Sequence, residues 1–135
     1  MLVVKKRYIA LIVIAVIVVA VFAIVMGVSA WLTRGLDEMA QMQINNVDLN
    51  SLSDGTYRGS FRGYRWSNSV EVVIESNRIA DIRITEKHRF HREELIQELT
   101  SRIIDEQSID VDTVSGATVS SKAFLKAIEN ALSGQ

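Results

Sequence analysis

The 135-residue chain contains no cysteine and no proline. Without cysteine it cannot form a disulfide, a thiolate metal site, an iron–sulfur cluster or a covalently attached c-type haem from its own residues. Only two histidines are present, His88 and His91, and two histidines alone cannot complete a closed zinc site. We expect both to be solvated loop residues, with a role as ligand or proton donor as the alternative. A redox function would therefore need a cofactor that is held in some other way, and we expect no metal.

Charge of either sign is limited, because 15 basic and 16 acidic side chains give a formal net charge of −1. Three of the basic residues, Lys5, Lys6 and Arg7, precede a long apolar run, so the remainder of the chain is net acidic. This balance argues against a nucleic-acid partner. The sequence also offers no pairing of a nucleophile with a base, which argues against a stand-alone enzyme.

The longest feature is a run without charge, rich in valine, isoleucine and alanine, from Tyr8 to Leu32. As a helix it would span about 37 Å, and the hydrocarbon core of a bilayer is about 30 Å thick. We predict a transmembrane helix over 8–32 after a basic cytoplasmic segment, 1–7, with the rest of the chain outside the cytoplasm. A cleaved signal peptide is the alternative, because Val28-Ser29-Ala30 has small residues, but signal peptides have shorter apolar cores.

After this run the chain divides into a polar stretch and a patterned one. Residues 33–53 have a mixed pattern, and we predict a tether that is helical at first. Residues 54–135 are enough for one small domain. Within it, apolar and polar residues alternate from Tyr57 to Gly63, a pattern that predicts a strand. Gly59 and Gly63 share one face of that strand, and there they either leave space for a ligand or mark a bulge or a strongly twisted edge.

Two further strands and two helices follow from the same kind of pattern. Val70, Val72 and Ile74 alternate with polar residues, as do Ala80, Ile82 and Ile84, with a turn at Ser76-Asn77 between them. Helical spacing follows over 93–107 and again from Ser121. We expect the helix over 93–107 to lie on the apolar face of the sheet. The predicted fold class is α+β: an N-terminal transmembrane helix, then a small domain with an antiparallel meander of three or more strands packed by two amphipathic helices.

A hydroxyl-rich loop leads into the last helix, and it reads Asp112-Thr113-Val114-Ser115-Gly116-Ala117-Thr118-Val119-Ser120-Ser121. Its glycine permits a tight turn, and the start of a helix offers unpaired N–H groups and a positive dipole end, which suit a phosphate. The alternative is that Ser120 or Ser121 caps the helix and Ser115-Gly116 turns the chain. The residue types by themselves favour that alternative.

The order of these features resembles the FMN-binding domain family, known from the flavin-carrying subunits of the Rnf and Nqr redox pumps and from other membrane-anchored electron carriers. The resemblance runs from about Leu52 to Leu132, and it rests on Asp54-Gly55-Thr56-Tyr57, the two strand glycines, the hairpin turn and the hydroxyl-rich loop. In that family a flavin transferase joins FMN to a threonine hydroxyl through a phosphodiester. The transferase recognises Asp, two variable residues, Ser or Thr, Gly, Ala, and Ser or Thr.

Carried over to this chain, the resemblance implies that Asp112 is the recognition residue, that Ser115-Gly116-Ala117 forms the loop and that Thr118 carries the flavin. The N–H groups of Val119, Ser120 and Ser121 would face the phosphate. The implied protein is a membrane-anchored, extracytoplasmic electron carrier or redox subunit of a bacterial type. A flavin transferase would mature it, and its redox partners would be donor and acceptor proteins or the quinone pool.

Two other functions remain open at this point. The domain could bind FMN or another phosphate ligand reversibly, as a flavin donor or sensor. It could also be a structural, membrane-tethered subunit without a cofactor.

Overall fold

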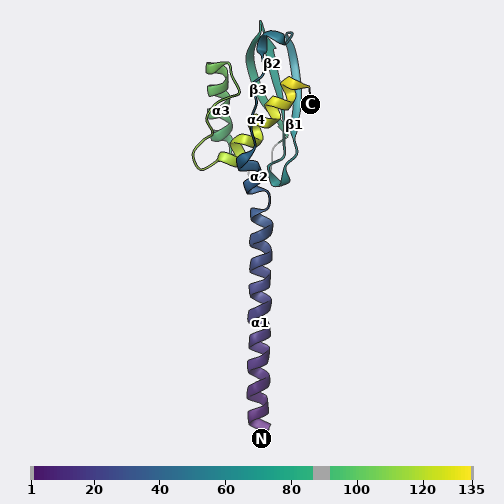
Figure 1. Ribbon diagram of the computed structural model, residues 1–135, viewed down its shortest axis with the longest axis vertical. Helices are drawn as coiled ribbons and strands as arrows, with labels where there is room; N and C mark the ends of the chain where they lie inside the picture. The colour runs from purple at the N-terminus through teal and green to yellow at the C-terminus, as the bar shows by residue number, and fades with distance from the viewer. Residues whose placement is uncertain (1, 87–91, 135) are drawn as a thin grey trace. The chain divides into compact units, whose positions relative to one another are not determined.

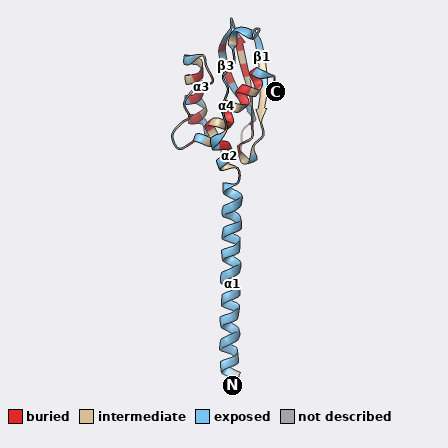
Figure 2. Cartoon of the chain, viewed as in Figure 1, coloured by how far each residue is buried: buried red, intermediate tan, exposed pale blue. Residues whose placement is uncertain are grey.

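The computed structural model describes residues 2–86 and 92–134, which form two compact units, Met1–Arg34 and Gly35–Gln135 (Figure 1). The first unit is the helix α1 (Leu2–Thr33), which contains the predicted span. Within the described residues it is the one helix long and apolar enough to cross a membrane. From Val3 onward its side chains are exposed, so no protein core covers the apolar run (Figure 2).

The second unit has an α+β fold. Its elements are α2 (Leu36–Gln41), η1 (Leu49–Ser51), β1 (Gly55–Phe61), η2 (Tyr64–Trp66), β2 (Asn68–Glu75), β3 (Arg78–Glu86), α3 (Glu93–Glu106) and α4 (Thr118–Ser133). The strands form one antiparallel sheet in the order β1-β2-β3, which confirms the predicted meander.

The β2–β3 hairpin turns at Ser76-Asn77, as the sequence predicted. Both residues have positive φ angles, 52° and 60°, which matches the twist of a two-residue hairpin turn. A register shift just after this turn makes Ile74 pair with Ile79 and Val73 with Asp81, so Ala80 has no partner of its own. Our expectation that Ala80 lies on the buried face was wrong, because this bulge turns Ile79 inward and leaves Ala80 exposed.

The predicted helix over 93–107, α3, shares the core with the apolar face of the sheet, as expected. The helix that covers most of the sheet is α4. α4 lies across β1 and β2, and α3 packs against β3 (Figure 1). Gly59 makes the close approach of α4 possible, since a Cβ there would lie 2.2 Å from the Ala131 backbone nitrogen and 2.6 Å from the Ala127 oxygen. The register of β1 against β2 is unbroken at this point. The space at Gly59 is therefore filled by a helix of the same domain, and it marks neither a ligand nor a bulge.

The opposite face of the sheet is polar. Arg58 pairs with Glu71 at 2.7 Å and Arg83 with Asp81 at 2.7 Å, and both guanidinium groups are exposed. The side-chain amide of Gln107 bonds both backbone groups of Ile79 in β3. It accepts a hydrogen bond from the Ile79 N–H at 2.7 Å and donates one to the Ile79 oxygen at 3.0 Å. One face of the sheet is thus buried and the other solvated, which agrees with the alternation of apolar and polar residues along its strands.

Residues 33–53 differ from the predicted tether. From Gly35 onward they belong to the compact unit of the domain, and the Met39 side chain is only 3% exposed. Asn45 donates its backbone N–H to Glu129 Oε2 at 3.0 Å, and Lys122 Nζ donates to the Met42 oxygen at 2.8 Å. The compact unit thus begins at Gly35, not at 54, because apolar residues of this segment pack against the core that α4 forms.

Candidate functional site

The hydroxyl-rich loop ends where α4 begins, at Thr118, three residues before the predicted start at Ser121. The N-cap residue is Ala117, which has no side-chain acceptor for the first turn. Neither Ser120 nor Ser121 is therefore the cap. Among the described residues no partner is found for the N–H groups of Thr118, Val119 and Ser120. Such a helix start carries a partial positive charge and open donors.

The fourth N–H group of this turn, that of Ser121, is already used. It donates to the Ala117 oxygen at 2.8 Å, which is the first bond of the helix. Our expectation that Ser121 would offer its N–H to a phosphate was therefore wrong, because the helix begins one turn earlier than its apolar pattern indicated. The open donors belong instead to Thr118, Val119 and Ser120.

The chain reverses direction just before α4, at Ser115-Gly116, as the sequence predicted. The Ala117 N–H donates to the Val114 oxygen at 3.0 Å, which closes the turn. Gly116 has a φ of 74°, in the left-handed region that favours glycine. A Cβ built on Gly116 would meet no atom within 4 Å, so the outside of the turn is open. Ser115, Gly116 and Thr118 are all exposed there.

Ser121 secures this turn from inside the protein. Its side chain is fully buried, and its Oγ accepts a hydrogen bond from the Val114 N–H at 3.1 Å. A buried amide without an acceptor is costly, so this contact holds the turn in one position against α4. Sequence reasoning expected Ser121 to face a ligand, whereas its hydroxyl is used to support the turn.

Asp112, the predicted recognition residue, lies at the other end of the loop with its side chain exposed. Its backbone oxygen accepts a hydrogen bond of 2.9 Å from the guanidinium of Arg102 on α3. Arg102 is also paired with Glu98, one helical turn earlier. Asp112 lines an open hollow of about 440 Å³ together with Arg102, Glu106, Asp110 and Thr113. Arg102 thus joins the loop at Asp112 to α3, a contact that nothing in the motif indicated.

An aromatic residue that sequence reasoning did not single out packs beside the first turn of α4. Trp66 of η2 is 5% exposed and forms a small cluster with Met39 and Ala123, against which Val119 packs. The buried amide of Asn68 donates to the Trp66 oxygen at 3.2 Å and to the Ala123 oxygen at 3.1 Å. This joins the start of β2 to both η2 and α4.

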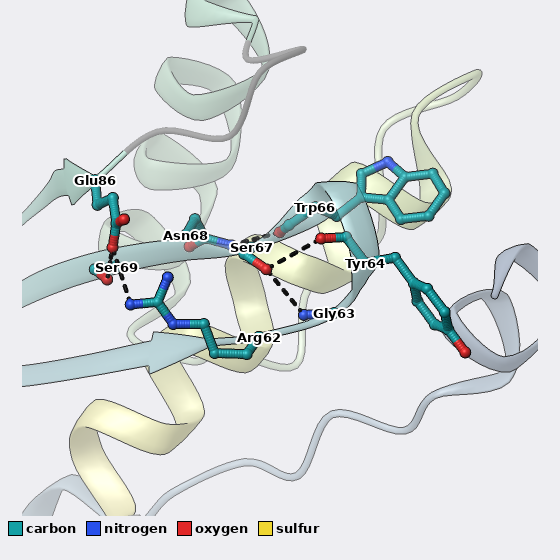
Figure 3. A network of polar contacts seen from close by, with 8 residues as sticks. All are labelled: Arg62, Gly63, Tyr64, Trp66, Ser67, Asn68, Ser69 and Glu86. Carbon is teal, nitrogen blue, oxygen red and sulfur yellow. Dashed lines mark hydrogen bonds and ion pairs between the residues drawn. The ribbon is translucent and has the colours of Figure 1, made fainter. Parts of the chain in front are cut away.

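Polar contacts fix the loop that carries Trp66 (Figure 3). Ser67 Oγ accepts from the Gly63 N–H at 3.1 Å and donates to the Tyr64 oxygen at 3.3 Å. On the neighbouring strands, the Ser69 hydroxyl and the Arg62 guanidinium both bond the Glu86 carboxylate, at 3.0 and 3.1 Å. The hydrogen bond from Ser69 has the larger effect and that from Arg62 adds to it. Together they lower the pKa of the Glu86 carboxyl below its ordinary value.

Lys122 stands one helical turn after Thr118, but its ammonium group is already bound. Lys122 Nζ donates to the backbone oxygens of Ala40 and Met42, at the end of α2. An i, i+4 spacing from Thr118 is visible in the sequence, and it would have suggested a phosphate contact. The structure instead uses this lysine to hold α2 against α4.

The match to the family model covers just over half of the chain: the model of the FMN-binding domain matches residues 63–133, from η2 to the end of α4. The chain belongs to the FMN-binding domain family. The resemblance inferred from the sequence is thus confirmed, and FMN is the ligand that this family binds.

Two relatives of this FMN-binding domain are longer proteins. It is 28% identical over 92 residues to an NADH:acrylate oxidoreductase of Vibrio harveyi, covering 67% of this chain and 9% of that protein. It is 30% identical over 87 residues to an uncharacterized protein of Treponema pallidum (strain Nichols), covering 60% of this chain and 23% of that one. The chain therefore spans less than a quarter of the length of either relative.

The donor groups at the start of α4 fit the phosphate end of FMN. Three N–H groups are open, the adjoining turn is unobstructed at Gly116, and the Thr118 side chain is exposed beside them. No group of metal-ligating side chains occurs among residues 2–86 and 92–134. His88 and His91 lie outside the described residues.

Proposed function

We propose that this protein is a membrane-anchored, extracytoplasmic electron carrier with FMN attached by a phosphodiester to the Oγ of Thr118. The observation that supports this most directly is Thr118 itself. It is the last residue of the family's attachment motif, and it is exposed on the first turn of α4 beside three open N–H groups. The match to the FMN-binding domain family and the similarity to an oxidoreductase support the redox role.

The chain's own residues would position and retain the cofactor. Attachment forms a bond between the FMN phosphorus and Thr118 Oγ and breaks the P–O bond to the leaving group of the transferase's flavin donor. The proton of the Thr118 hydroxyl goes to that leaving group, so the chain gains one FMN less one water. The phosphodiester keeps one negative charge, which the N–H groups and dipole of α4 would stabilise by about 0.3–1 kcal/mol. The isoalloxazine ring supplies the electron chemistry when FMN is bound. Ser121 would hold the turn, and Asp112 would be read by the flavin transferase.

An extracytoplasmic position of the domain would explain why the cofactor is bound covalently. We assign the cytoplasmic side to the N-terminus because Lys5, Lys6 and Arg7 precede the apolar run, whereas Arg34 is followed by Asp37 and Glu38. The domain would then face a compartment in which a dissociated flavin is lost by diffusion. A phosphodiester prevents that loss even though the domain is too small for a deep pocket.

The attachment site is tested by producing the full chain together with a flavin transferase and separating it on a denaturing gel. We expect flavin fluorescence in the wild-type band and none after Thr118→Val. Thr113→Val is the matched control, because it removes a threonine hydroxyl from the same loop and should leave the band fluorescent.

Two results would contradict the covalent assignment. Fluorescence that survives Thr118→Val would place the flavin on another residue. Stoichiometric flavin in the native protein that is lost on denaturation would identify a reversible FMN-binding module instead.

A further inference from the structure

We infer that Arg102 of α3 is a positioning residue for flavin transfer, because it presents Asp112 to the flavin transferase. This inference rests on the proposed function, in which the transferase reads Asp112 and joins FMN to Thr118. It goes beyond that function by giving α3, which lies outside the attachment motif, a part in recognition by the transferase. In this role Arg102 acts through Asp112 and needs no contact with the flavin.

The guanidinium group of Arg102 is divided between two partners. Arg102 Nη1 donates to the Asp112 backbone oxygen at 2.9 Å, and Nη2 is paired with the Glu98 carboxylate one helical turn earlier. Pairing with Glu98 offsets the charge of Arg102 and fixes the direction of its guanidinium fork. Arg102 therefore reaches the loop as an oriented hydrogen-bond donor.

Asp112 is bound through its backbone and open at its side chain. Its carboxylate is exposed and has no ion pair or hydrogen bond with any residue in the described parts of the chain. A direct pair between Arg102 and this carboxylate would cover the charge that the transferase is proposed to read. The observed bond to the backbone oxygen instead holds Asp112 and leaves its carboxylate accessible.

The bond from Arg102 is also the first of two fixed points along the motif. Within residues 2–86 and 92–134 it is the one hydrogen bond to the backbone of residues 111–113. The next fixed point is Val114, whose N–H donates to Ser121 Oγ at 3.1 Å. Without Arg102 the backbone at Asp112 would lose its hydrogen bond and would sample more conformations than it does in this structure.

The two fixed points tie Asp112 and Thr118 to one core. Arg102 belongs to α3 and Ser121 to α4, and both helices contribute buried side chains to the same hydrophobic cluster. Figure 1 shows the connection from α3 leading back to the first turn of α4. A free segment from 112 to 118 would let its ends lie up to about 20 Å apart. An enzyme that contacts both residues at once binds more tightly when their separation is already set, because less conformational entropy is lost on binding.

The kinetics of flavin transfer test this inference, with the full chain in detergent as the varied substrate and a purified flavin transferase with its flavin donor in excess. Arg102→Met keeps the aliphatic stem but removes the donors. It should raise KM for the chain about three- to tenfold, the range expected for one lost hydrogen bond, and leave kcat unchanged. Arg102→Lys keeps one donor and should raise KM less.

Arg58→Met is the matched control, because it removes an exposed guanidinium group that is also paired with a carboxylate, that of Glu71, on the solvated face of the sheet. It should leave both KM and kcat unchanged. The Arg102 side chain is itself partly exposed, so we expect its variants to fold, and thermal unfolding followed by circular dichroism verifies this.

A double-mutant cycle with Asp112→Asn separates positioning from a general structural effect. Because Arg102 acts through Asp112, Arg102→Met should add little to KM once Asp112→Asn is present. Effects of the two substitutions that multiply would overturn the inference, as would an unchanged KM in Arg102→Met or a loss confined to kcat. These results would leave the flavin on Thr118 in the wild type. A wild-type chain that gains no flavin would instead contradict the proposed function, and the inference with it.

Discussion

Ser120 and Ser121 are neighbours in the first turn of α4, but they face different surroundings. Ser121 is fully buried and accepts the Val114 N–H, whereas Ser120 is half-buried and has no hydrogen bond through its hydroxyl among the described residues. The sequence shows two equivalent hydroxyls at this point. Only the position of the helix start, which sets the direction of each side chain, distinguishes the residue that holds the turn from the one beside it.

Ser121→Ala should lower the free energy of unfolding by about 1–3 kcal/mol, because it leaves the buried Val114 N–H without an acceptor. Ser120→Ala is the matched control and should change stability by less than about 0.5 kcal/mol. Chemical denaturation of the full chain in detergent measures both. Equal stability of the two variants would mean that the Ser121 contact does not hold the turn.

Glu129 is a buried carboxylate that ties residues 42–47 to α4. Asn45 donates to it through its backbone N–H at 3.0 Å and its side-chain amide at 3.3 Å, and Lys126 pairs with it at 2.9 Å. Burial alone would raise the pKa of Glu129. The hydrogen bonds from Lys126 and Asn45 together outweigh burial, and the pKa of Glu129 lies below its ordinary value of 4.5.

Because the pKa of Glu129 is lower in the folded than in the unfolded protein, its ionised form stabilises the fold above the unfolded pKa. This contribution is lost as pH falls below about 4.5 and through the folded pKa. Glu129→Gln should therefore lower stability at neutral pH by about 1–3 kcal/mol and make it less dependent on pH in the acid range. Denaturation curves at pH 7 and across the acid range measure this. An unchanged acid dependence in the variant would contradict the role given to Glu129.

At the scale of elements, the packing of α4 on β1 positions the start of the helix. Asn130 donates to the Ser60 oxygen at 2.9 Å, next to the point where the Gly59 backbone meets Ala127 and Ala131. Because α4 is held at Ala127 and Ala131, the number of helical residues back to Thr118 determines where the first turn of α4 lies. A shift of the helix on the sheet would therefore move the proposed site.

Gly59→Ala should destabilise the domain by about 1–3 kcal/mol or more, because the added methyl group would overlap backbone atoms of α4 that cannot rotate away. Gly116→Ala is an informative comparison. No atom crowds that position, so its smaller cost comes only from the left-handed backbone. Thermal unfolding followed by circular dichroism measures both, and a Gly59→Ala variant as stable as the wild type would contradict the packing described.

The sequence predicted the order and kind of these elements well, because their periodicities are local. It correctly indicated the long apolar helix, the three strands, the turn at Ser76-Asn77 and two amphipathic helices. It missed the bulge at Ala80, the start of α4 at Thr118 and the folding of residues 35–53 onto the domain. The bulge and the folding of residues 35–53 involve contacts between distant parts of the chain, such as Gln107 with Ile79 and Asn45 with Glu129. The start of α4 lies outside the apolar pattern from which the helix was predicted.

For the proposed site, the turn at Ser115-Gly116 is confirmed, and the roles of Thr118 and Asp112 remain predictions. The motif located Thr118, the turn at Gly116 and Asp112, because these follow one another in the chain. The motif could not indicate the contacts made by residues outside it. Arg102 lies on α3 and Trp66 on η2, and Lys122 of α4 bonds residues at the end of α2. Their roles become visible only when these elements are brought together.

At the scale of the whole molecule, the chain combines one long apolar helix with one small domain. α1 supplies the apolar length for a membrane span, and the domain supplies a family fold that binds FMN. The cysteine-free, net acidic domain has no other redox ligand among its described residues. Electron transfer by this chain would therefore depend on the flavin, and the central claim is that the flavin is bonded to Thr118.

The most direct measurement of that claim is the mass of the intact full chain, purified after production with a flavin transferase and analysed under denaturing conditions. The account predicts an increase equal to one FMN less one water, with the added mass on the peptide that contains Thr118 and absent from the Thr118→Val variant. An unmodified mass in the wild type, or the same increase in Thr118→Val, would contradict it.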